Sequence, residues 1–425
     1  MKIYVISKNG KPLMPTTPAR AIKMLRDGKA KCIRRTPFTI KLTYQTDNYT
    51  QNLTLGIDTG SSKIGSAVVK ENGDIIYLSQ IEIRNDITDK MKQRSKYRRN
   101  RRNRKTRYRQ ARWLNRKNSI KKDRFSPTMT SKINSHVKEI EFVKSILPIK
   151  NIILETGNFD THALKNPAVL KNKWLYQRGT NYGFANTKAF VLDRDSYTCQ
   201  HCKGKSKDSK LEVHHIVFRS NGGSNEESNL VCLCKTCHDK LHKGEISLNK
   251  KGKIKSQLKH ATQMNSIRVQ LLKIYSTAKE TFGYITKEHR QLMSLLKEHF
   301  LDAVAIAVLD NIRNTGLISV NFQTSLLRKK CVSDGDFQQS KGIRSEQKIP
   351  TGKIQGFRKF DKVNYFGKEY FIKGRMSSGY AILMDIEGNK IDFSGMPKGF
   401  KTPKLNNCKR IQARNSWMIM QKNIA

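Results

Sequence analysis

Residues 52–69, NLTLGIDTGSSKIGSAVV, decide the fold class of this 425-residue chain. Two apolar stretches, each long enough for a strand, flank a short Gly/Ser segment that is typical of a turn. This pattern predicts a β-hairpin that opens an α/β sheet. The first predicted strand ends on Asp58, so a carboxylate stands directly before the turn.

Acidic residues take similar positions in two later segments. NIILET, residues 151–156, predicts a strand ending on Glu155, and LKEHFLDAVAIAVLDNI, residues 296–312, predicts an apolar helix. In that helix His299 precedes Asp302 by one turn, which places both side chains on one face. Each acid alone is more often a strand-end or helix-surface carboxylate, so the set needs support from the rest of the chain.

Two Cys-x-x-Cys pairs, Cys199/Cys202 and Cys234/Cys237, supply four thiolates for a tetrahedral zinc ion. Small modules use such an ion to fold, and this cysteine usage indicates a reducing compartment rather than a disulfide framework. The insert between the pairs contains LEVHHI (211–216), Gly-Gly (222–223) and Ser-Asn-Leu (228–230). We expect the remaining cysteines to be buried reduced thiols: Cys32, Cys232, Cys331 and Cys408.

The sequence leaves two alternatives open for this module. A purely structural zinc ribbon with surface histidines would have the same cysteine pairs. His242 follows His238 by four positions, and it is either a further metal ligand or part of a solvated helix face.

The charge of the chain is strongly one-sided, with 83 Lys and Arg against 34 Asp and Glu and a formal net charge of +49. Self-repulsion opposes compaction unless a polyanion neutralises it, so nucleic acid is the expected partner and a membrane surface the weaker alternative. No apolar run approaches the ~20 residues of a membrane-spanning helix. The first residues, MKIYVISKNG, lack the pattern of a signal peptide.

Residues 90–124 hold 18 Lys and Arg against one acid and contain neither Pro nor Gly, so a long helix is permitted. A helix with basic residues on every face cannot bury an apolar stripe against its own protein. Arginine grips phosphates, and aromatic side chains stack on unpaired bases. The alternative, a basic localisation or ribosomal-type tail, would normally lie at a terminus. The expected nucleic-acid contacts are Arg94, Tyr97, Arg98, Arg99, Arg101, Arg102, Arg104, Arg107, Tyr108, Arg109, Arg112, Trp113 and Arg116.

The cysteine–histidine module resembles the zinc-stapled HNH nuclease signature, with CxxC, HHI, GG, NL and CxxCH in that order. The resemblance implies a ββα-metal fold that holds one divalent cation, Mg²⁺, beside the scissile phosphate. It assigns His215 as the general base, His214 and His238 as ligands of the catalytic metal, and Asn229 as the residue that ties the loop. Because neighbouring strand residues point to opposite faces, His214 and His215 share a site only where the strand twists or ends.

The distant acids resemble the RuvC-like, RNase H-fold nuclease triad, in the order Asp, Glu, Asp with a nearby His. The resemblance implies that Asp58, Glu155 and Asp302 bind two Mg²⁺ ions, and that His299 orients or deprotonates the nucleophile. Sugar-kinase-like ATPases of the same broad fold also open with a GIDxG hairpin, but we find no adenosine site in the sequence.

The order of these parts resembles the IscB family of RNA-guided nucleases, which are transposon-associated relatives of type II CRISPR effectors. Residues 12–15, PLMP, match the tetrapeptide after which the IscB N-terminal domain is named. The resemblance spans residues 1 to about 325 and is weakest in the last hundred. It implies an α/β multidomain fold, with a split RNase H-like (RuvC) core, an arginine-rich bridge helix, an inserted zinc-stapled HNH domain and a small C-terminal β domain.

The expected segments follow the chain from its first residue to its last. They are an N-terminal PLMP domain (1–52), RuvC-like segment I (53–87), the bridge helix (88–126), RuvC-like segment II (127–160), a linker (161–189), the HNH domain (190–248), RuvC-like segment III (249–325) and a C-terminal β domain that contacts RNA and the target-adjacent motif (326–425).

The resemblance implies an RNA-guided DNA endonuclease, in which the HNH site cuts the guide-paired strand and the RuvC-like site cuts the displaced strand. Its partners would be a structured guide RNA and double-stranded DNA with an adjacent motif. The protein would be a monomer in its RNA complex, associated with DNA in a prokaryotic cytoplasm. Two other hypotheses stay open: a protein-only resolvase or homing-type HNH nuclease, and a non-cleaving RNA-binding protein.

Overall fold

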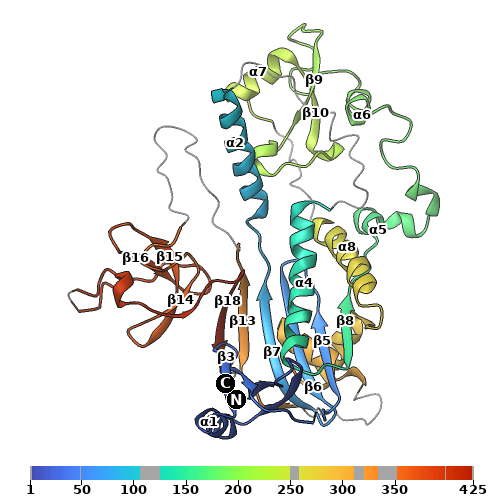
Figure 1. Cartoon of the computed structure of the whole chain (residues 1–425). Helices are drawn as coiled ribbons and strands as arrows, with labels where there is room; N and C mark the ends of the chain where they lie inside the picture. Colours follow the sequence, from blue (N-terminus) through green and yellow to red (C-terminus); the bar gives the residue numbers. More distant parts are fainter. Residues whose placement is uncertain are drawn as a thin grey trace. The chain divides into compact units, whose positions relative to one another are not determined.

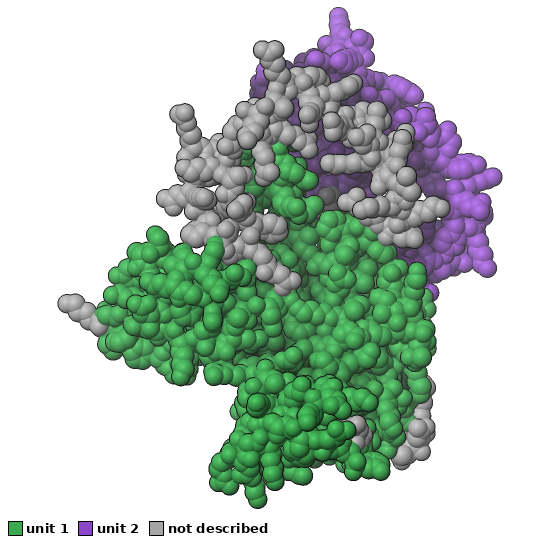
Figure 2. Space-filling model, in the orientation of Figure 1, with its two compact units in different colours: residues 1–157, 266–425 green, residues 158–265 purple. Residues whose placement is uncertain are grey.

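The computed structural model describes residues 2–47, 49–105, 125–248, 258–310, 320–333, 352–397 and 399–423, with the backbone alone for 101–105. The chain forms two compact units (Figure 2). Unit 1 consists of residues 1–157 and 266–425, and unit 2 of residues 158–265. Each has its own sheet and apolar core, so each is described by itself.

An eight-stranded sheet forms the centre of unit 1 (Figure 1). Its strand order is β11-β8-β5-β6-β7-β13-β18, and β12 pairs with β7. β5, β6 and β7 form an antiparallel meander, and β8 and β11 continue the sheet in parallel with β5. The strands are β5 (Leu53–Asp58), β6 (Lys63–Lys70), β7 (Asp74–Glu82), β8 (Asn151–Thr156), β11 (Lys279–Phe282), β12 (Asn321–Phe322), β13 (Leu326–Cys331) and β18 (Trp417–Lys422).

The hairpin expected from residues 52–69 is β5 and β6, joined by the Gly/Ser turn. Every residue of β5 is buried, because β5 lies between β8 and β6 and is covered by a helix. This explains why its sequence is a continuous apolar run rather than an alternating one.

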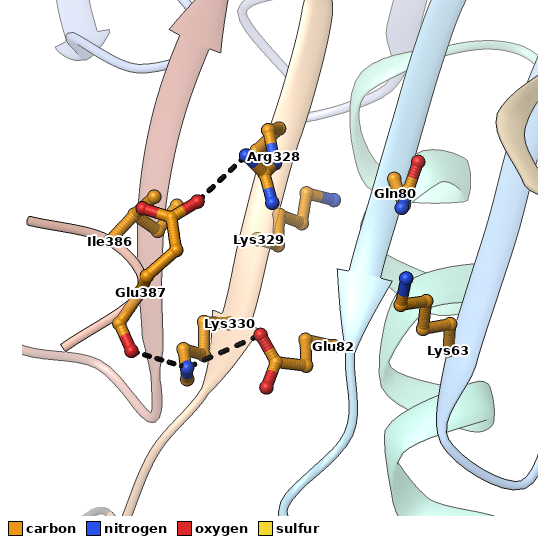
Figure 3. A pocket seen from close by; sticks show the side chains of 8 residues that line it. All are labelled: Lys63, Gln80, Glu82, Arg328, Lys329, Lys330, Ile386 and Glu387. Atoms are coloured by element: carbon orange, nitrogen blue, oxygen red, sulfur yellow. Dashed lines mark hydrogen bonds and ion pairs between the residues drawn. The ribbon is translucent and has the colours of Figure 1, made fainter. Parts of the chain in front are cut away.

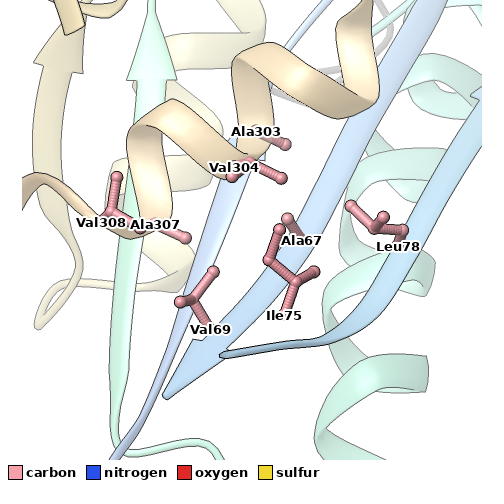
Figure 4. Packing of buried hydrophobic residues seen from close by; sticks show 8 residues of the cluster. All are labelled: Ala67, Val69, Ile75, Leu78, Ala303, Val304, Ala307 and Val308. Atoms are coloured by element: carbon pink, nitrogen blue, oxygen red, sulfur yellow. The ribbon is translucent and has the colours of Figure 1, made fainter. Parts of the chain in front are cut away.

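Helix α10 (His299–Ala307) covers one face of β5 and β6 (Figure 4). Two glycines allow the helix backbone to touch the strands. A Cβ on Gly56 would lie 2.4 Å from the carbonyl oxygen of Ala303, and a Cβ on Gly65 would lie 1.8 Å from that of His299. Neither position admits a side chain. The apolar contact comprises Ala67, Val69, Ile75, Leu78, Ala303, Val304, Ala307 and Val308.

Helix α4 (Pro127–Ile146) packs on the other face of the same sheet. Its buried Glu139 accepts hydrogen bonds from Ser66, and Ser66 neighbours Ala67, which faces α10. Adjacent strand residues point to opposite faces, so the sheet lies between the two helices. The other helices with residues in unit 1 are α1 (Pro18–Arg26), α2 (Ile87–Lys105), α9 (Gly283–Leu292) and part of α8 (Leu258–Ile274).

The N-terminal residues of unit 1 form a separate four-stranded sheet in the order β2-β1-β4-β3. The PLMP tetrapeptide lies in strand β2, which residues 12–16 form. β2 is an edge strand, where proline's missing N–H leaves no ladder bond broken. The bounds are β1 (Ile3–Ile6), β2 (Pro12–Thr16), β3 (Ala30–Arg34) and β4 (Thr39–Leu42).

The C-terminal residues are divided between two sheets. β14 (Lys362–Tyr365), β15 (Lys368–Arg375), β16 (Ala381–Met384) and β17 (Lys409–Gln412) form a four-stranded sheet of their own. β13 and β18 instead extend the central sheet, with β13 parallel to β7 and antiparallel to β18. A domain that begins at residue 326 therefore does not describe the structure, because two of its strands pair with the core.

Unit 2 contains the antiparallel pair β9 (Leu211–His215) and β10 (Leu230–Cys234), followed by α7 (Lys235–Lys243). It also contains α6 (Thr187–Arg194). Residues 161–189, expected to be a linker, form part of this unit through α5 (Thr161–Lys165) and the short 3₁₀ turns Pro167–Leu170 and Lys173–Tyr176.

Two expectations about single features can be compared directly. Cys32 is exposed, contrary to the expectation that it is buried, because it lies on edge strand β3, whereas Cys232, Cys331 and Cys408 are buried. Within the described ranges, none of the helices has both the length and the apolar composition needed to span a bilayer.

Candidate functional site

Asp58 and Glu155 lie side by side at the carboxyl ends of two neighbouring strands of the central sheet. Asp58 is the last residue of β5, and the parallel pairing of β5 with β8 places it opposite Glu155. Thr59, directly after β5, donates a 2.6 Å hydrogen bond to the carbonyl oxygen of Glu155. Parallel pairing therefore brings together two carboxylates that are far apart in sequence.

His299 contacts this pair from the start of α10. Its Nδ1 lies 2.6 Å from Oδ2 of Asp58. The contact depends on Gly65. This residue of β6 is paired with Asp58 of β5, and its missing side chain leaves room for the His299 backbone. The hydrogen bond that His299 donates to Asp58 raises the pKa of His299, while burial and the Lys63 ammonium oppose the shift.

Asp302 lies one helical turn beyond His299. Its Oδ1 is 2.8 Å from Nε of Arg290, a residue of α9. Burial and the charge of Asp58 raise the pKa of Asp302, and Arg290 acts in the opposite direction. We call Asp58, Glu155, His299 and Asp302 the acid site.

Electrostatics in the acid site favour a bound cation. Burial raises the pKa of Glu155 to about 7, with further contributions from Asp58 and Asp302. Burial also raises the pKa of Asp58, while His299 lowers it. Carboxylates that raise one another's pKa are repelling one another, and a divalent cation between them would relieve that repulsion.

The cysteine pairs of unit 2 converge. The Sγ atoms of Cys199, Cys202, Cys234 and Cys237 all lie within 4.8 Å of one another. The Cys202 and Cys234 sulfurs are 3.8 Å apart. A tetrahedral zinc with Zn–S bonds of ~2.3 Å requires sulfurs ~3.8 Å apart, so the donor set and its spacing fit zinc. A hydrogen bond from Ser206 lowers the pKa of Cys202 to about 6.

Three histidines form a second cluster in unit 2. They are His214, His238 and His242, and one ring nitrogen of each lies within 4.8 Å of one ring nitrogen of the other two. Burial lowers the pKa of His214 to about 4, and the neighbouring histidines add to the shift. Its buried Nε2 has no hydrogen-bond partner among the described residues, which leaves this nitrogen available to a metal ion. Glu212 Oε2 lies 3.2 Å from His238 Nδ1, where a carboxylate can orient the ring.

His215 contacts different side chains from its neighbour His214. Its Nε2 lies 3.0 Å from Oδ1 of Asn225 and 3.3 Å from Nε of Arg219. Alternation along β9 explains why the two rings have different partners, and His215 is the last residue of that strand. Asn229 is fully buried and spans the loop, since Oδ1 accepts from the Val217 N–H and Nδ2 donates to the Val217 carbonyl.

Helix α2 carries the described part of the basic segment. Arg94, Arg98 and Arg99 are exposed, and Tyr97 is half-buried and accepts a 3.0 Å hydrogen bond from Gln93. For Arg101, Arg102 and Arg104 the structure describes only the helical backbone. The remaining expected contacts lie outside the described residues: Arg107, Tyr108, Arg109, Arg112, Trp113 and Arg116.

Sequence reasoning missed two polar contacts and left one ligand open. His242 belongs to the histidine cluster, and its spacing of four residues from His238 was the available signal. Glu212 precedes His214 by two positions on the same strand, which places both on one face. No pattern marks Arg290, because its contact with Asp302 depends on how α9 packs against α10.

Two protein families match parts of the chain. Residues 3–179 match the RRXRR protein family, and residues 199–244 match the HNH endonuclease family. The first match includes residues 98–102, whose sequence RRNRR has the pattern of the family's name. The second includes the four cysteines and the three-histidine cluster.

Two curated proteins and several solved structures are similar to parts of the chain. Anaredoxin from Nostoc sp. is 39% identical over 59 residues, which are 14% of this chain and 75% of anaredoxin. The type IV methyl-directed restriction enzyme EcoKMcrA from Escherichia coli is 37% identical over 62 residues, which are 13% of this chain and 22% of that enzyme.

Among solved structures, Streptococcus thermophilus Cas9 in complex with the AGAA PAM has a TM-score of 0.34 and 13% identity, covering 58% of this chain and 32% of that Cas9. The type II-C Cas9 enzyme from Actinomyces naeslundii has a TM-score of 0.16 and 15% identity, covering 43% of this chain and 27% of that enzyme. The chain thus spans a third or less of these solved chains. Residues 199–244, which contain the cysteine pairs and the clustered histidines, thus match the HNH endonuclease family and identify an HNH domain within the chain.

Proposed function

We propose that the chain is an RNA-guided DNA endonuclease of the IscB type with two separate hydrolytic centres. The HNH site in unit 2 would cut the guide-paired strand, and the acid site in unit 1 would cut the displaced strand. The observation that carries the proposal is the convergence of Asp58, Glu155, His299 and Asp302, from three distant segments, in a chain that also contains an HNH module.

The acid site has the features of an RNase H-like nuclease centre. An antiparallel three-stranded meander followed by parallel strands, with acids at the ends of β5 and β8, is the arrangement such a centre requires. Asp58, Glu155 and Asp302 would hold two Mg²⁺ ions, since carboxylate oxygens suit that ion. Bound cations would activate the attacking water and offset the charge that develops on the phosphate. His299 would hold Asp58 in place and accept a proton from the water.

The HNH site would use its histidines in two roles. His215 would accept the proton of the attacking water, while Asn229 keeps the loop in position through its backbone hydrogen bonds. His214, His238 and His242 would hold the cation. Three imidazoles suit a transition metal better than Mg²⁺, so this site favours Mn²⁺, Ni²⁺ or Zn²⁺ over the Mg²⁺ expected from the resemblance.

The four thiolates would hold a structural zinc. Their sulfur spacing matches a tetrahedral site, and four protein thiolates leave no open coordination position. Zinc bound there would join the segment of Cys199 and Cys202, which follows α6, to the end of β10 and the start of α7, and so support the nearby histidines. It would play no part in the chemistry.

A structured guide RNA would be the main partner of the basic segment. The net charge of +49 and the exposed arginines of α2 supply the phosphate contacts that RNA binding needs. Pairing of the guide would then read the target sequence, and the protein would read backbone shape and a short adjacent motif. The sheet β14–β17 is the candidate for contacting that motif.

Strand-resolved cleavage tests the proposal. The protein is purified with its copurifying RNA and given a matched duplex with each strand labelled separately. Asp58→Ala should abolish cutting of the displaced strand alone, and His215→Ala cutting of the guide-paired strand alone. If either variant still cuts both strands, the role assigned to that residue is wrong.

The copurifying nucleic acid separates the other hypotheses. A single structured RNA of defined length supports an RNA-guided enzyme. Cleavage without any RNA would instead support a resolvase or homing-type nuclease. RNA binding without metal-dependent cleavage of a matched target would support a non-cleaving RNA-binding protein.

A further inference from the structure

One face of the central sheet has an apolar half and a polar half. Helix α10 covers the apolar half (Figure 4) and begins at His299, directly over Gly65. Beyond that point the same face is lined by charged and polar side chains from β6, β7 and β13, with one from the segment that follows β16 (Figure 3). They are Lys63, Gln80, Glu82, Arg328, Lys330 and Glu387.

Strand register places this polar half in line with the acid site. Asp58 pairs with Gly65, Gly65 with Gln80, and Gln80 with Arg328. Residues directly opposite one another on neighbouring strands lie on the same face of a sheet. Strands are ~4.8 Å apart, so Gln80 lies ~10 Å and Arg328 ~14 Å from Asp58 along this row.

A second row runs beside the first and adds two cations. Lys63 pairs with Glu82, and Glu82 pairs with Lys330. Lys63 is exposed and its charge already acts on His299, so this row also reaches the acid site. Between Arg328 and Lys330, Lys329 points to the opposite face and is buried there. Alternation along β13 thus puts Lys329 in the interior, and Arg328 and Lys330 on the outward face.

The outward cations are held by carboxylates that a phosphate could replace. Arg328 Nη1 lies 2.7 Å from Glu387 Oε1, and Lys330 Nζ lies 3.2 Å from Glu82 Oε2. All four side chains keep between 26% and 42% of their surface exposed. Exposed ion pairs of this kind contribute little to stability and are screened by salt. An arginine fork that now binds a carboxylate presents the same geometry to a phosphate.

A plain solvated sheet face would also carry charged residues. Such a face would not be expected to carry Lys63, Arg328 and Lys330 all on the same side of the sheet as the acid site and in register with it. The cations of these two rows favour a polyanion that passes over the acid site.

We propose that Lys63, Gln80, Arg328 and Lys330 form a track that binds the backbone of the DNA strand cut at the acid site. With one phosphate over Asp58 and Glu155, the neighbouring phosphates of that strand extend beside the start of α10, past Lys63 on β6, to Arg328 and Lys330 on β13. Arg328 and Lys330 exchange their glutamate partners for phosphates when the strand binds. This inference rests on the proposed function and names the residues that position its substrate.

The test uses the full protein with its guide RNA and a matched target whose displaced strand is already unpaired, so that duplex opening does not limit the rate. The variant Lys63→Ala/Arg328→Ala/Lys330→Ala should raise KM for displaced-strand cutting roughly tenfold and make its dependence on salt shallower by about 0.7 per lost contact. Cutting of the guide-paired strand should stay at the wild-type rate. Glu387→Gln should act in the opposite direction and lower KM.

A matched control lies on the other side of the sheet. Lys144 of α4 pairs with Glu141 at 3.2 Å and is similarly exposed, so Lys144→Ala removes an equivalent ion pair without touching the track. It should cut both strands like the wild type. A triple variant that behaves like this control overturns the track, and so does a triple variant that loses both cuts equally.

Asp58→Ala distinguishes failure of the track from failure of the proposed function. If Asp58→Ala still cuts the displaced strand, the acid site is not the centre for that strand and the proposed function itself fails. If Asp58→Ala loses that cut while the triple variant keeps the wild-type KM, only the track is wrong.

Discussion

Lys329 Nζ lies 2.6 Å from Oε2 of Glu139, and neither side chain has any exposed surface. The ammonium also donates to the Tyr77 hydroxyl and lies 4.0 Å from the centre of the Phe142 ring. The pair connects β13 to α4 through the interior of unit 1. It therefore fixes β13, on which Arg328 and Lys330 flank Lys329 and point to the face of the sheet that carries the acid site.

Breaking this buried pair should destabilise unit 1 strongly. Glu139→Gln or Lys329→Met leaves one uncompensated group in the core, so we expect the free energy of unfolding to fall by about 3–5 kcal/mol. The double variant Glu139→Leu/Lys329→Met removes both charges and should recover part of that loss. Denaturant unfolding monitored by tryptophan fluorescence measures it, and equal stability of the single variants and the wild type would contradict the assignment.

The same pair predicts a loss of stability in acid. Burial alone raises the pKa of Glu139, but the Lys329 ammonium and the hydrogen bonds outweigh burial and hold that pKa below its usual value. The stabilisation is therefore complete above the unfolded pKa of ~4.3 and is lost as the pH falls through the lower folded pKa. Unfolding curves between pH 3 and 6 should show a steeper loss for the wild type than for the double variant.

Gly65→Ala should disturb the acid site through the backbone. The new Cβ would meet the His299 carbonyl oxygen at 1.8 Å, and two backbones cannot relieve a clash by changing rotamer. We expect a loss of about 1–3 kcal/mol and reduced cutting of the displaced strand, with the guide-paired strand still cut. Gly395→Ala is the control, since its Cβ would meet nothing within 4 Å. Wild-type stability and cleavage in Gly65→Ala would show that α10 is not held by this contact.

Cys237→Ser should remove zinc from unit 2. We expect the variant to contain about one zinc per chain less than the wild type, since four thiolates define a closed site. Because binding free energy contributes directly to folding in such modules, residues around β9 and β10 should become sensitive to protease. Cys232→Ser, next to the cluster but outside it, should keep its zinc. Full zinc content in Cys237→Ser, measured by mass spectrometry, would disprove the four-thiolate site.

His242→Ala should weaken metal binding at the histidine cluster. Losing one of three imidazoles should lower Mn²⁺ affinity by at least ~10–100-fold, the usual cost of removing even an outer contact. Titration calorimetry in the Asp58→Ala background isolates this site from the acid site. His162→Ala, which changes a histidine of unit 2 outside the cluster, should bind Mn²⁺ like its parent. Unchanged affinity in His242→Ala would show that His242 is not a metal ligand but part of a solvated helix face.

Strong local patterns made parts of the fold predictable. The apolar runs of β5 and β8 and the apolar helix α10 follow from periodicity and length, which depend only on neighbouring residues. β2 is not predictable in this way, because two prolines argue against a strand unless its edge position is known. β13 and β18 could not be assigned to the central sheet, because strands from several sheets share the same alternating pattern and pairing depends on partners far along the chain.

The candidate site shows the same division. Residue type and spacing indicated the four cysteines and His214, because metal ligands follow recurrent spacings. The partners that tune the sites, such as Arg290 beside Asp302 and Glu212 beside His238, leave no local pattern. Their positions result from packing between elements, which periodicity does not report.

The division of the acid site among distant segments has a consequence during synthesis. His299 and Asp58 are 241 positions apart, so at ~5–20 residues per second a ribosome needs roughly 10–50 s after making one to make the other. Until α10 emerges, the nascent chain holds two repelling carboxylates without their histidine and third acid. The acid site is therefore incomplete on the nascent chain until the ribosome has passed residue 302.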